Sequence, residues 1–541
     1  MHQQPFENNN NIETAAALQC THYSKKLESS SAVFRNMEPP GRLGRSNMLL
    51  GDDRRCDPRL ISFLAESRHD ERPLNPHMSR STPIDERIAA IGLSELRLSA
   101  LLERAAKAAP ELKEASVTHS TETIAGELPT GKEGDPNKDG TYITLHISRP
   151  ATGNVTYLST DMPCVYFIHG GMMGMGSPES GYYGRVRDEI AVRANAAVVG
   201  IEYRKSAGKA GAHPFPDGLN DAIKGLMWAK KNLKALGVGP KIVVCADCGG
   251  ANLALAMAIH LNRKGDGAAC ADVQERVAGA EEAGIFDFSK KDDDAAAADS
   301  KQAAAAVVAA AARDLDTNGD DEDAEVRGAE GVVSEGDTAA AAAAGSAKVQ
   351  YRALREHVSG IYILSPFIYG CYDNHLKVLL SLVENDQYLY SRAQLVLLSS
   401  VYDPTGLHKD DPLAWPYHAS PEEDLKGFPP TRVILHELDP LRDEGLTFYR
   451  KLLRAGVKGA SCNTVHGVCH GGDFLAMAWA YDSVFTAMLD DFVAFARAMP
   501  ALMEPAAAAR KGKGRAAGGK KNGTEAGAGG GGRLPGGRWD W

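Results

Sequence analysis

A cysteine lies at the turn between a predicted strand and a predicted helix, in the stretch VVCADCGGANLALAMAI (residues 243–259). A short β-branched strand, a tight turn of small residues and an apolar helix together make a nucleophile elbow, which lifts one reactive side chain above a sheet. Such elbows usually carry serine in G-x-S-x-G. The five positions here are filled by Ala246, Asp247, Cys248, Gly249 and Gly250. Cys248 is therefore a nucleophile, a redox or metal-binding cysteine, or the remnant of an inactive site.

A glycine-rich turn follows an earlier predicted strand, in FIHGGMMGMGS (residues 167–177). Gly170 and Gly171 have no Cβ, so their backbone N–H groups can approach a substrate closely. The N–H of Gly249 directly follows the candidate nucleophile. Together these three N–H groups could stabilise a developing oxyanion, although a glycine-rich loop can also be only a turn.

An acid and two histidines follow later in the chain, each beyond a predicted strand. Asp439 lies in HELDPLRDEG, where an acid can orient a general base or can instead be the N-cap of the next helix. His466 and His470 lie in NTVHGVCHGGDF, between the last predicted strand and the last helix. A base must reach the nucleophile and be held by an acid. A histidine in this loop suits that role, although an isolated loop histidine is usually only solvated.

Strand and helix patterns alternate around these motifs. The stretches CVYFIH, AVVGIEYR, KIVVCA and GIYILSPFI have the pattern of apolar strands, and helical patterns such as DGLNDAIKGLMWAKKNL separate them. Near-continuous apolar strands alternating with helices predict an α/β fold, with a mostly parallel sheet covered by helices on both faces. The candidate nucleophile, oxyanion glycines, acid and base then all lie at carboxyl ends of strands.

Read in chain order as oxyanion loop, nucleophile, acid and base, these motifs resemble the hormone-sensitive-lipase-like family of α/β-hydrolases, the fold-3 esterases. The resemblance covers about residues 56–500. The stretches that carry it are HGG from His169, EYR from Glu202, HPFPDGLNDA from His213, DCGGANLA from Asp247, DPLRDEG from Asp439 and HGGD from His470.

The resemblance implies an α/β-hydrolase fold with a cap of N-terminal helices at about residues 56–113. It implies that Cys248 is the nucleophile, Asp439 the acid and His470 the base. The oxyanion hole implied is Gly170, Gly171 and Gly249. The activity implied is hydrolysis of carboxylic esters or thioesters with small acyl groups, without a cofactor.

Three residues depart from the family pattern: Met172 replaces the third glycine of HGGG, Ala246 the first glycine of the elbow, and Cys248 the serine. A neighbouring His⁺ and a helix N-terminus both lower the pKa of a cysteine. A Cys-His-Asp triad is therefore chemically sensible, and dienelactone hydrolases look like this. Sulfur is larger than oxygen, however, and can misplace the oxyanion in a hole shaped for serine. The alternative is a catalytically disarmed α/β-hydrolase that binds a small ligand, as the gibberellin receptors of plants do, which resemble the same family.

A zinc or redox site is a third interpretation, from a different set of residues. Cys245 and Cys248 form C-x-x-C, and His466, Cys469 and His470 form HGVCH. Cys245 falls inside a predicted buried strand, where cysteine more often acts as a small hydrophobe. We therefore expect no metal at this site.

Segments of biased composition frame and interrupt the hydrolase pattern. Residues 1–55 are polar with an asparagine run, residues 265–349 form an acidic, alanine-rich insertion, and residues 505–541 form a basic, glycine-rich tail. Such compositions bury too little apolar surface to fold, and they predict disorder at both ends and a low-complexity insertion.

The insertion contains an EF-hand-like spacing, D-x-D-x-N-G-x5-E. Its residues are Asp314, Asp316, Asn318, Gly319 and Glu325. Asp321 stands where an apolar residue is usual, and VRGAEG after it is too rich in glycine to continue as a helix. We expect no calcium site tighter than roughly millimolar.

Charge and composition bear on the kind of partner and on the cellular compartment of the protein. The net charge of −10 gives no whole-chain footprint for nucleic-acid binding. Nine irregularly spaced cysteines fit a reducing compartment better than a disulfide scaffold. We identify no signal peptide and no apolar run long enough to span a membrane. These features predict a cytoplasmic protein. The resemblance to the esterase family implies that its partner is a small-molecule ester.

Overall fold

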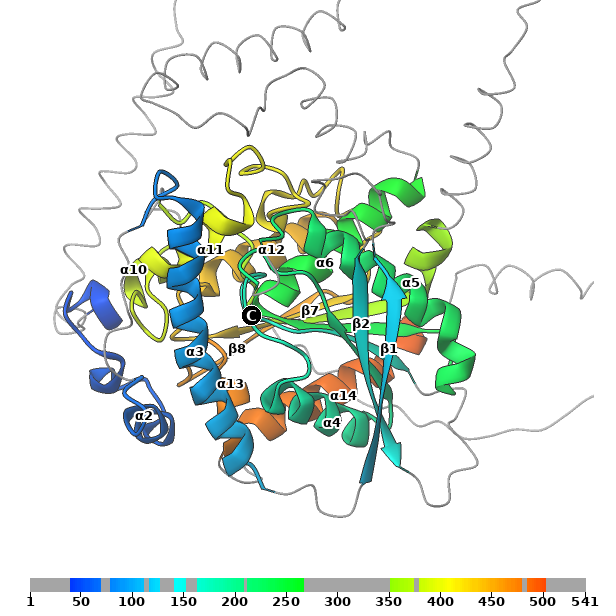
Figure 1. Ribbon diagram of the computed structural model, residues 1–541, viewed down its shortest axis with the longest axis horizontal. Helices are drawn as coiled ribbons and strands as arrows, with labels where there is room; N and C mark the ends of the chain where they lie inside the picture. The colour runs from blue at the N-terminus through cyan, green and yellow to red at the C-terminus, as the bar shows by residue number, and fades with distance from the viewer. Residues whose placement is uncertain are drawn as a thin grey trace, which may run out of the picture. The chain divides into compact units, whose positions relative to one another are not determined.

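A sheet of eight strands in the order β1-β2-β4-β3-β5-β6-β7-β8 forms the centre of the computed structural model (Figure 1). The structure describes residues 39–69, 78–110, 116–126, 141–151, 163–208, 212–266, 351–373, 379–478 and 484–502. β1 and β2 pair antiparallel, β2 pairs antiparallel with β4, and the strands from β4 to β8 pair in parallel. The predicted α/β-hydrolase fold with a mostly parallel sheet is confirmed. The strands are β1 (Ser116–Ala125), β2 (Tyr142–Ala151), β3 (Cys164–Ile168), β4 (Ala197–Glu202), β5 (Ile242–Asp247), β6 (Val358–Leu364), β7 (Thr431–His436) and β8 (Ser461–Val465).

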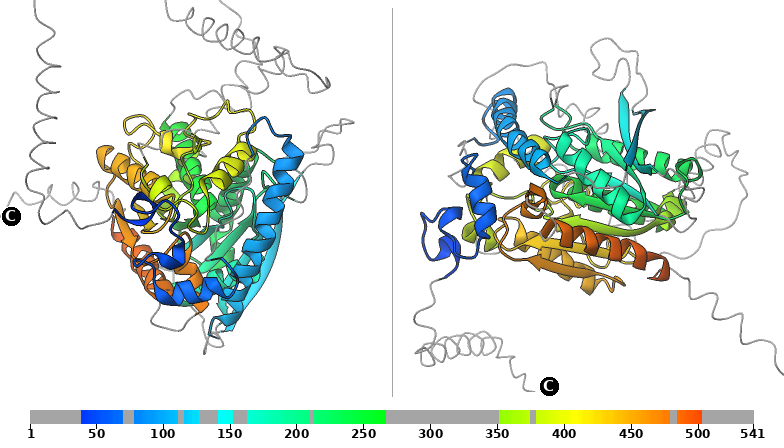
Figure 2. Two further views of the ribbon diagram at one scale, coloured as in Figure 1. Left: turned by 90° about the vertical axis from the view of Figure 1, so that its left-hand side faces the viewer. Right: turned by 90° about the horizontal axis from the view of Figure 1, so that it is seen from below.

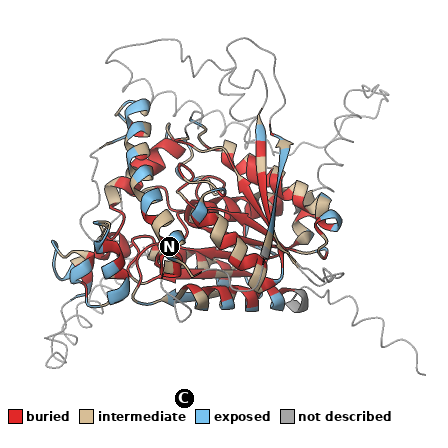
Figure 3. Ribbon diagram, turned by 60° about the horizontal axis from the view of Figure 1, so that its bottom comes forward, coloured by how far each residue is buried: buried red, intermediate tan, exposed pale blue. Residues whose placement is uncertain are grey.

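Helices cover both faces of this sheet. α4 (Gly181–Ala194) and α14 (Val484–Leu502) pack on one face, and α5 (Asp217–Leu236), α6 (Cys248–Asp266) and α12 (Arg442–Arg454) pack on the other (Figure 1). Every residue of β3, β5 and β6 is buried, because a central parallel strand has helices on both sides and needs apolar residues at each position. Exposed residues lie mainly on the outer sides of the helices (Figure 3).

Further helices lie beyond the carboxyl edge of the parallel strands. α2 (Pro58–Ala65) and the long helix α3 (Ile84–Ala108) fall in the range expected for the cap, and both lie at one end of the sheet (Figure 2). α3 packs against α4 and α11 (Arg392–Tyr402). The remaining short helices are η1 (Gly41–Leu43), η2 (Leu50–Asp52), α10 (Ser381–Glu384), η3 (Pro416–His418), α13 (Gly472–Leu475) and η4 (Ala476–Ala478).

The N-terminal boundary differs from the sequence-based expectation. We expected disorder through residue 55, yet residues 39–55 include η1 and η2, and Leu50 in η2 is buried. The cause is a set of contacts with residues far along the chain. Asp53 is buried and accepts a 2.9 Å hydrogen bond from the Tyr388 hydroxyl, and Arg55 pairs with both Asp53 and Glu384. The ordered part therefore begins before residue 56.

The other expected low-complexity segments lie almost wholly outside the described residues. Asp266, near the start of the expected insertion, is the last residue of α6. The rest of the insertion, its EF-hand-like stretch and the tail at 505–541 stay predictions. None of the helices in the described stretches is long and apolar enough to cross a bilayer.

Candidate active site

Cys248 sits at the junction of β5 and α6, in the strained backbone expected of a nucleophile elbow. Its φ of 49° lies in the left-handed region, which residues with a Cβ rarely adopt. Gly250 permits the sharp turn, since a Cβ there would lie 2.1 Å from the carbonyl oxygen of Ile168 on β3. The elbow predicted from the sequence is therefore present, with the thiol at the carboxyl edge of the sheet.

His470 and Asp439 approach the same edge from two other strand ends. Asp439 follows β7, and His470 lies between β8 and α13. His470 Nδ1 is 2.8 Å from Asp439 Oδ2, while Asp439 Oδ1 accepts a 2.8 Å hydrogen bond from the N–H of Leu441. Cys248 and His470 line the same narrow cavity. Because Nδ1 faces Asp439, Nε2 is the ring nitrogen left to exchange a proton with the thiol. The structure thus brings the three predicted residues together.

The charge of Asp439 changes the pKa of His470. Burial alone lowers the pKa of His470, but the charges of Asp439 and Cys248 and the hydrogen bond to Asp439 raise it well above 6.5. Burial raises the pKa of Asp439, yet the charge and hydrogen bond of His470 bring it below its usual value of 3.8. An ionised Asp439 therefore stabilises an imidazolium at His470.

The two other residues proposed from the motifs lie away from this cluster. His466 is 80% exposed and its Nδ1 is 3.2 Å from Glu437 Oε2, so it is not the base. Cys245 is a buried residue of β5, and burial raises the pKa of its thiol well above 9.0. Among the residues that the structure describes, no group of three or more His, Cys, Asp or Glu side chains is placed to hold a metal ion.

The predicted oxyanion glycines lie beside the thiol, but one of them has a different partner. The N–H of Gly170 donates to the hydroxyl of Tyr183 at 3.1 Å. The expectation that Gly170 belongs to the oxyanion hole is therefore wrong, because its N–H is directed at the Tyr183 hydroxyl and not at the substrate. Gly249 lies in the first turn of α6, where N–H groups have no acceptor within the helix. Gly171, with φ of 102°, begins the tight turn that follows.

A tyrosine and an aspartate beside the thiol were not assigned a role from the sequence. The Tyr183 hydroxyl, which accepts from Gly170, donates to Asp247 Oδ2 at 2.9 Å. Burial raises the pKa of Asp247 to about 7, against the opposing effect of the hydrogen bond from Tyr183. Asp247 was visible in the elbow motif, but nothing in the stretch SGYYGR marks Tyr183 as its partner.

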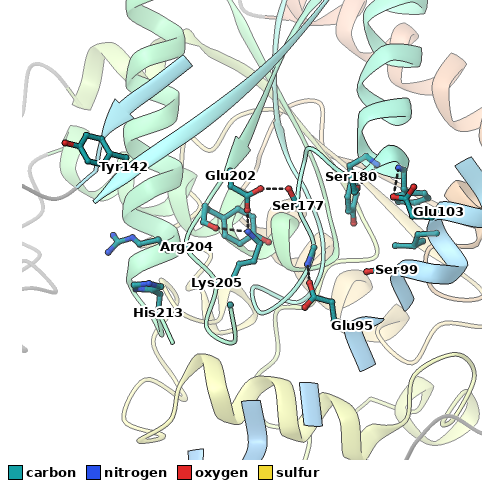
Figure 4. Close-up of a pocket in the computed structure, with 16 residues that line it drawn as sticks. Glu95, Ser99, Glu103, Tyr142, Ser177, Ser180, Glu202, Arg204, Lys205 and His213 are labelled. Atoms are coloured by element: carbon teal, nitrogen blue, oxygen red, sulfur yellow. Dashed lines mark hydrogen bonds and ion pairs between the residues drawn. The ribbon is translucent and has the colours of Figure 1, made fainter. Parts of the chain in front are cut away.

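Two cavities meet above the thiol. A narrow one of about 60 Å³ contains Cys248 and His470, and its apolar lining includes Leu98, Leu102 and Phe474. A larger one of about 430 Å³, which we call the vestibule, shares residues of α3 and α4 with it (Figure 4). The side chains lining the vestibule include Glu95, Glu103, Tyr142, Tyr182, Glu202 and Lys205. The two cavities share Glu95, Leu102 and Tyr183 in their linings, so the small pocket at the thiol adjoins the wider vestibule.

Comparison with known proteins agrees with this fold. The model of a family described by the alpha/beta hydrolase fold matches residues 165–280 and 294–473, more than half of the chain, so the chain belongs to this family. Brefeldin A esterase, described as a bacterial homologue of human hormone sensitive lipase, has a similar structure. Its TM-score is 0.61 at 28% identity, over 86% of this chain and 100% of that chain.

Two curated relatives match a shorter region. Carboxylesterase NlhH of Mycobacterium tuberculosis (strain CDC 1551 / Oshkosh) is 34% identical over 99 residues, which is 18% of this chain and 29% of the relative. Lipase 2 of Moraxella sp. (strain TA144) is 28% identical over 123 residues, which is 23% of this chain and 27% of the relative. The chain thus matches less than a third of the length of either relative.

Proposed function

We propose that this protein hydrolyses carboxylic esters or thioesters with small acyl groups through a Cys248–His470–Asp439 triad. The observation that carries the proposal is the position of His470, whose Nδ1 lies 2.8 Å from Asp439 and which lines the same narrow cavity as Cys248. The esterases and lipase among the similar proteins support the same class of reaction.

The first half of the reaction transfers the acyl group to sulfur. The Cys248 thiolate attacks the carbonyl carbon and forms a C–S bond, and the carbonyl oxygen becomes an oxyanion beside Gly171 and Gly249. Collapse of this intermediate breaks the C–O bond to the alcohol. The His470 imidazolium gives its Nε2 proton to the leaving alkoxide, which leaves a thioester acyl-enzyme and a neutral imidazole.

The second half uses water. Neutral His470 takes a proton from a water molecule, whose oxygen attacks the thioester carbonyl. The C–S bond then breaks, the carboxylic acid leaves, and the thiolate–imidazolium pair is restored. Asp439 orients the ring throughout and stabilises its charge.

The size of the inner pocket supports a small acyl group. The cavity beside Cys248 has a volume of only about 60 Å³, so it suits an acyl group of a few atoms. The vestibule would then hold the alcohol or thiol part of the substrate.

Turnover of p-nitrophenyl acetate and butyrate by wild type, Cys248→Ala and Cys248→Ser tests the proposal. We expect hydrolysis by wild type and none above background by Cys248→Ala. An inactive wild type together with an active Cys248→Ser variant would instead indicate a disarmed hydrolase that binds a small ligand.

A further inference from the structure

Helix α3 of the cap contacts the loop that carries the oxyanion glycine. We call residues 170–176 the oxyanion loop. The N–H of Gly176, its last residue, donates a 3.0 Å hydrogen bond to Glu95 Oε1 on α3. Figure 4 shows Glu95 pointing from α3 toward the loop, with this bond dashed. Glu95 also lines both the inner pocket and the vestibule, so it borders the cavity that contains Cys248 and His470.

The oxyanion loop has a shape that its own sequence does not favour. Met172 and Met173 have φ values of 52° and 57°, in the left-handed region. Non-glycine residues rarely adopt this conformation, and such conformations persist only where surrounding contacts impose them. The turn itself closes with hydrogen bonds from the N–H groups of Gly174 and Met175 to the carbonyl of Gly171, at 3.0 and 2.9 Å.

External contacts hold this strained loop at its middle and at its last residue. On the side of the sheet, the N–H of Ser206 donates to the carbonyl of Met173 at 2.9 Å. On the side of the cap, Glu95 accepts from Gly176, whose φ of 83° makes it a natural hinge. A carboxylate acceptor gives a stronger bond than a neutral one. Loss of Glu95 would free the end of the loop that faces the substrate.

We propose that Glu95 is a positioning residue, which fixes the oxyanion loop so that the N–H of Gly171 faces the carbonyl oxygen during acyl transfer. The proposal rests on the ester hydrolysis proposed above. The proposed role of Glu95 links the cap to the chemistry, because the position of α3 on the domain then sets the geometry of the oxyanion hole. Glu95 would act mainly on the step in which the oxyanion forms.

Three variants on α3 test this role. Glu95→Ala removes the acceptor, Glu95→Gln keeps a neutral oxygen acceptor, and Glu86→Ala removes an exposed carboxylate from the first turn of the same helix as a matched control. With p-nitrophenyl acetate we expect Glu95→Ala to lower kcat by about tenfold or more, with KM changed less than about threefold. Glu95→Gln should recover most of the loss, and Glu86→Ala should match wild type.

Two further measurements separate positioning from damage to the fold or the triad. Alkylation of Cys248 by iodoacetamide forms no oxyanion, so its rate should stay the same in Glu95→Ala while ester turnover falls. Hydrogen exchange of the peptide that spans residues 171–182 should be faster in Glu95→Ala than in wild type, and intermediate in Glu95→Gln.

The proposal is overturned if Glu95→Ala keeps the kcat of wild type or exchanges this peptide at the wild-type rate. It is also overturned if turnover and alkylation fall together, since that pattern indicates damage to the triad. A wild type that hydrolyses no ester would instead count against the proposed function, and the exchange comparison would still decide whether Glu95 holds the loop.

Discussion

His470 Nδ1 lies 2.8 Å from Asp439 Oδ2, and both side chains are almost completely buried. Water competes little for this contact, so the charge of Asp439 acts strongly on the imidazole. The pair therefore raises the pKa of His470 well above its usual value of 6.5, against the opposing effect of burial.

The first prediction concerns Asp439→Asn. Removing the carboxylate charge lowers the pKa of His470, so less of the protein carries an imidazolium beside the thiol. Because one pKa unit corresponds to a tenfold change in protonation, we expect alkylation of Cys248 at neutral pH to slow by about tenfold. The profile of rate against pH should shift to higher pH. Iodoacetamide labelling followed by peptide mass spectrometry measures both effects.

Cys371 provides an internal control for this experiment, because it is partly exposed and lies outside the triad. Its labelling rate should be the same in both proteins. An Asp439→Asn profile that superimposes on that of wild type would contradict the ion pair.

The second prediction concerns the pH dependence of stability at Asp247. Its pKa is about 7 in the folded protein, against an ordinary value of 3.8, because burial penalises the carboxylate. The folded state thus binds this proton more tightly than the unfolded state does. The resulting stabilisation is complete below about pH 4 and is lost as the pH rises through about 7.

Asp247→Asn removes this titration and keeps an oxygen acceptor for Tyr183. We compare the free energy of unfolding of the variant with that of wild type. The variant's value minus the wild-type value should rise between about pH 4 and 7 and then level off. The rise should be a few kcal/mol, since one pKa unit corresponds to about 1.4 kcal/mol. Denaturant unfolding at several pH values measures it, with the exposed Asp85→Asn as control. A difference that stays constant over this window would refute the raised pKa.

The third prediction concerns acyl length. Leu98 on α3 lines the inner pocket, so Leu98→Ala should admit longer chains. We expect the ratio of kcat/KM for p-nitrophenyl octanoate to that for acetate to rise by about tenfold, since one methylene in an apolar pocket is worth roughly 10- to 200-fold. Leu93, which is 62% exposed on the same helix, gives the control variant Leu93→Ala. An equal ratio in both variants would place the acyl group elsewhere.

The fold and triad could be predicted because their signals are local in sequence. The small residues around Cys248 mark a turn that only they permit, and the order of the motifs along the chain places each side chain at the end of a strand. The structure confirms the fold and brings Cys248, Asp439 and His470 together, while their catalytic roles stay predictions.

The contacts that were missed depend on packing between distant segments. Tyr183 and Asp247 are 64 positions apart, and Glu95 and Gly176 are 81 apart. The N-terminal boundary was misplaced for the same reason, since Asp53 meets Tyr388 across 335 positions. No periodicity or motif within one segment carries such information, so a polar stretch that docks on the domain looks like a disordered one.

The most direct test of the account is to trap the acyl-enzyme. Wild type, Cys248→Ala and His470→Ala are mixed briefly with p-nitrophenyl acetate, quenched in acid, and analysed by intact and peptide mass spectrometry. We predict that wild type carries one acetyl group, located on Cys248. This acetyl group should form more slowly in His470→Ala. Cys248→Ala should carry no acetyl group at position 248 and should lose turnover. Turnover by Cys248→Ala at the wild-type rate, or wild-type turnover with the acetyl group on another residue, would contradict the role of Cys248 as the nucleophile.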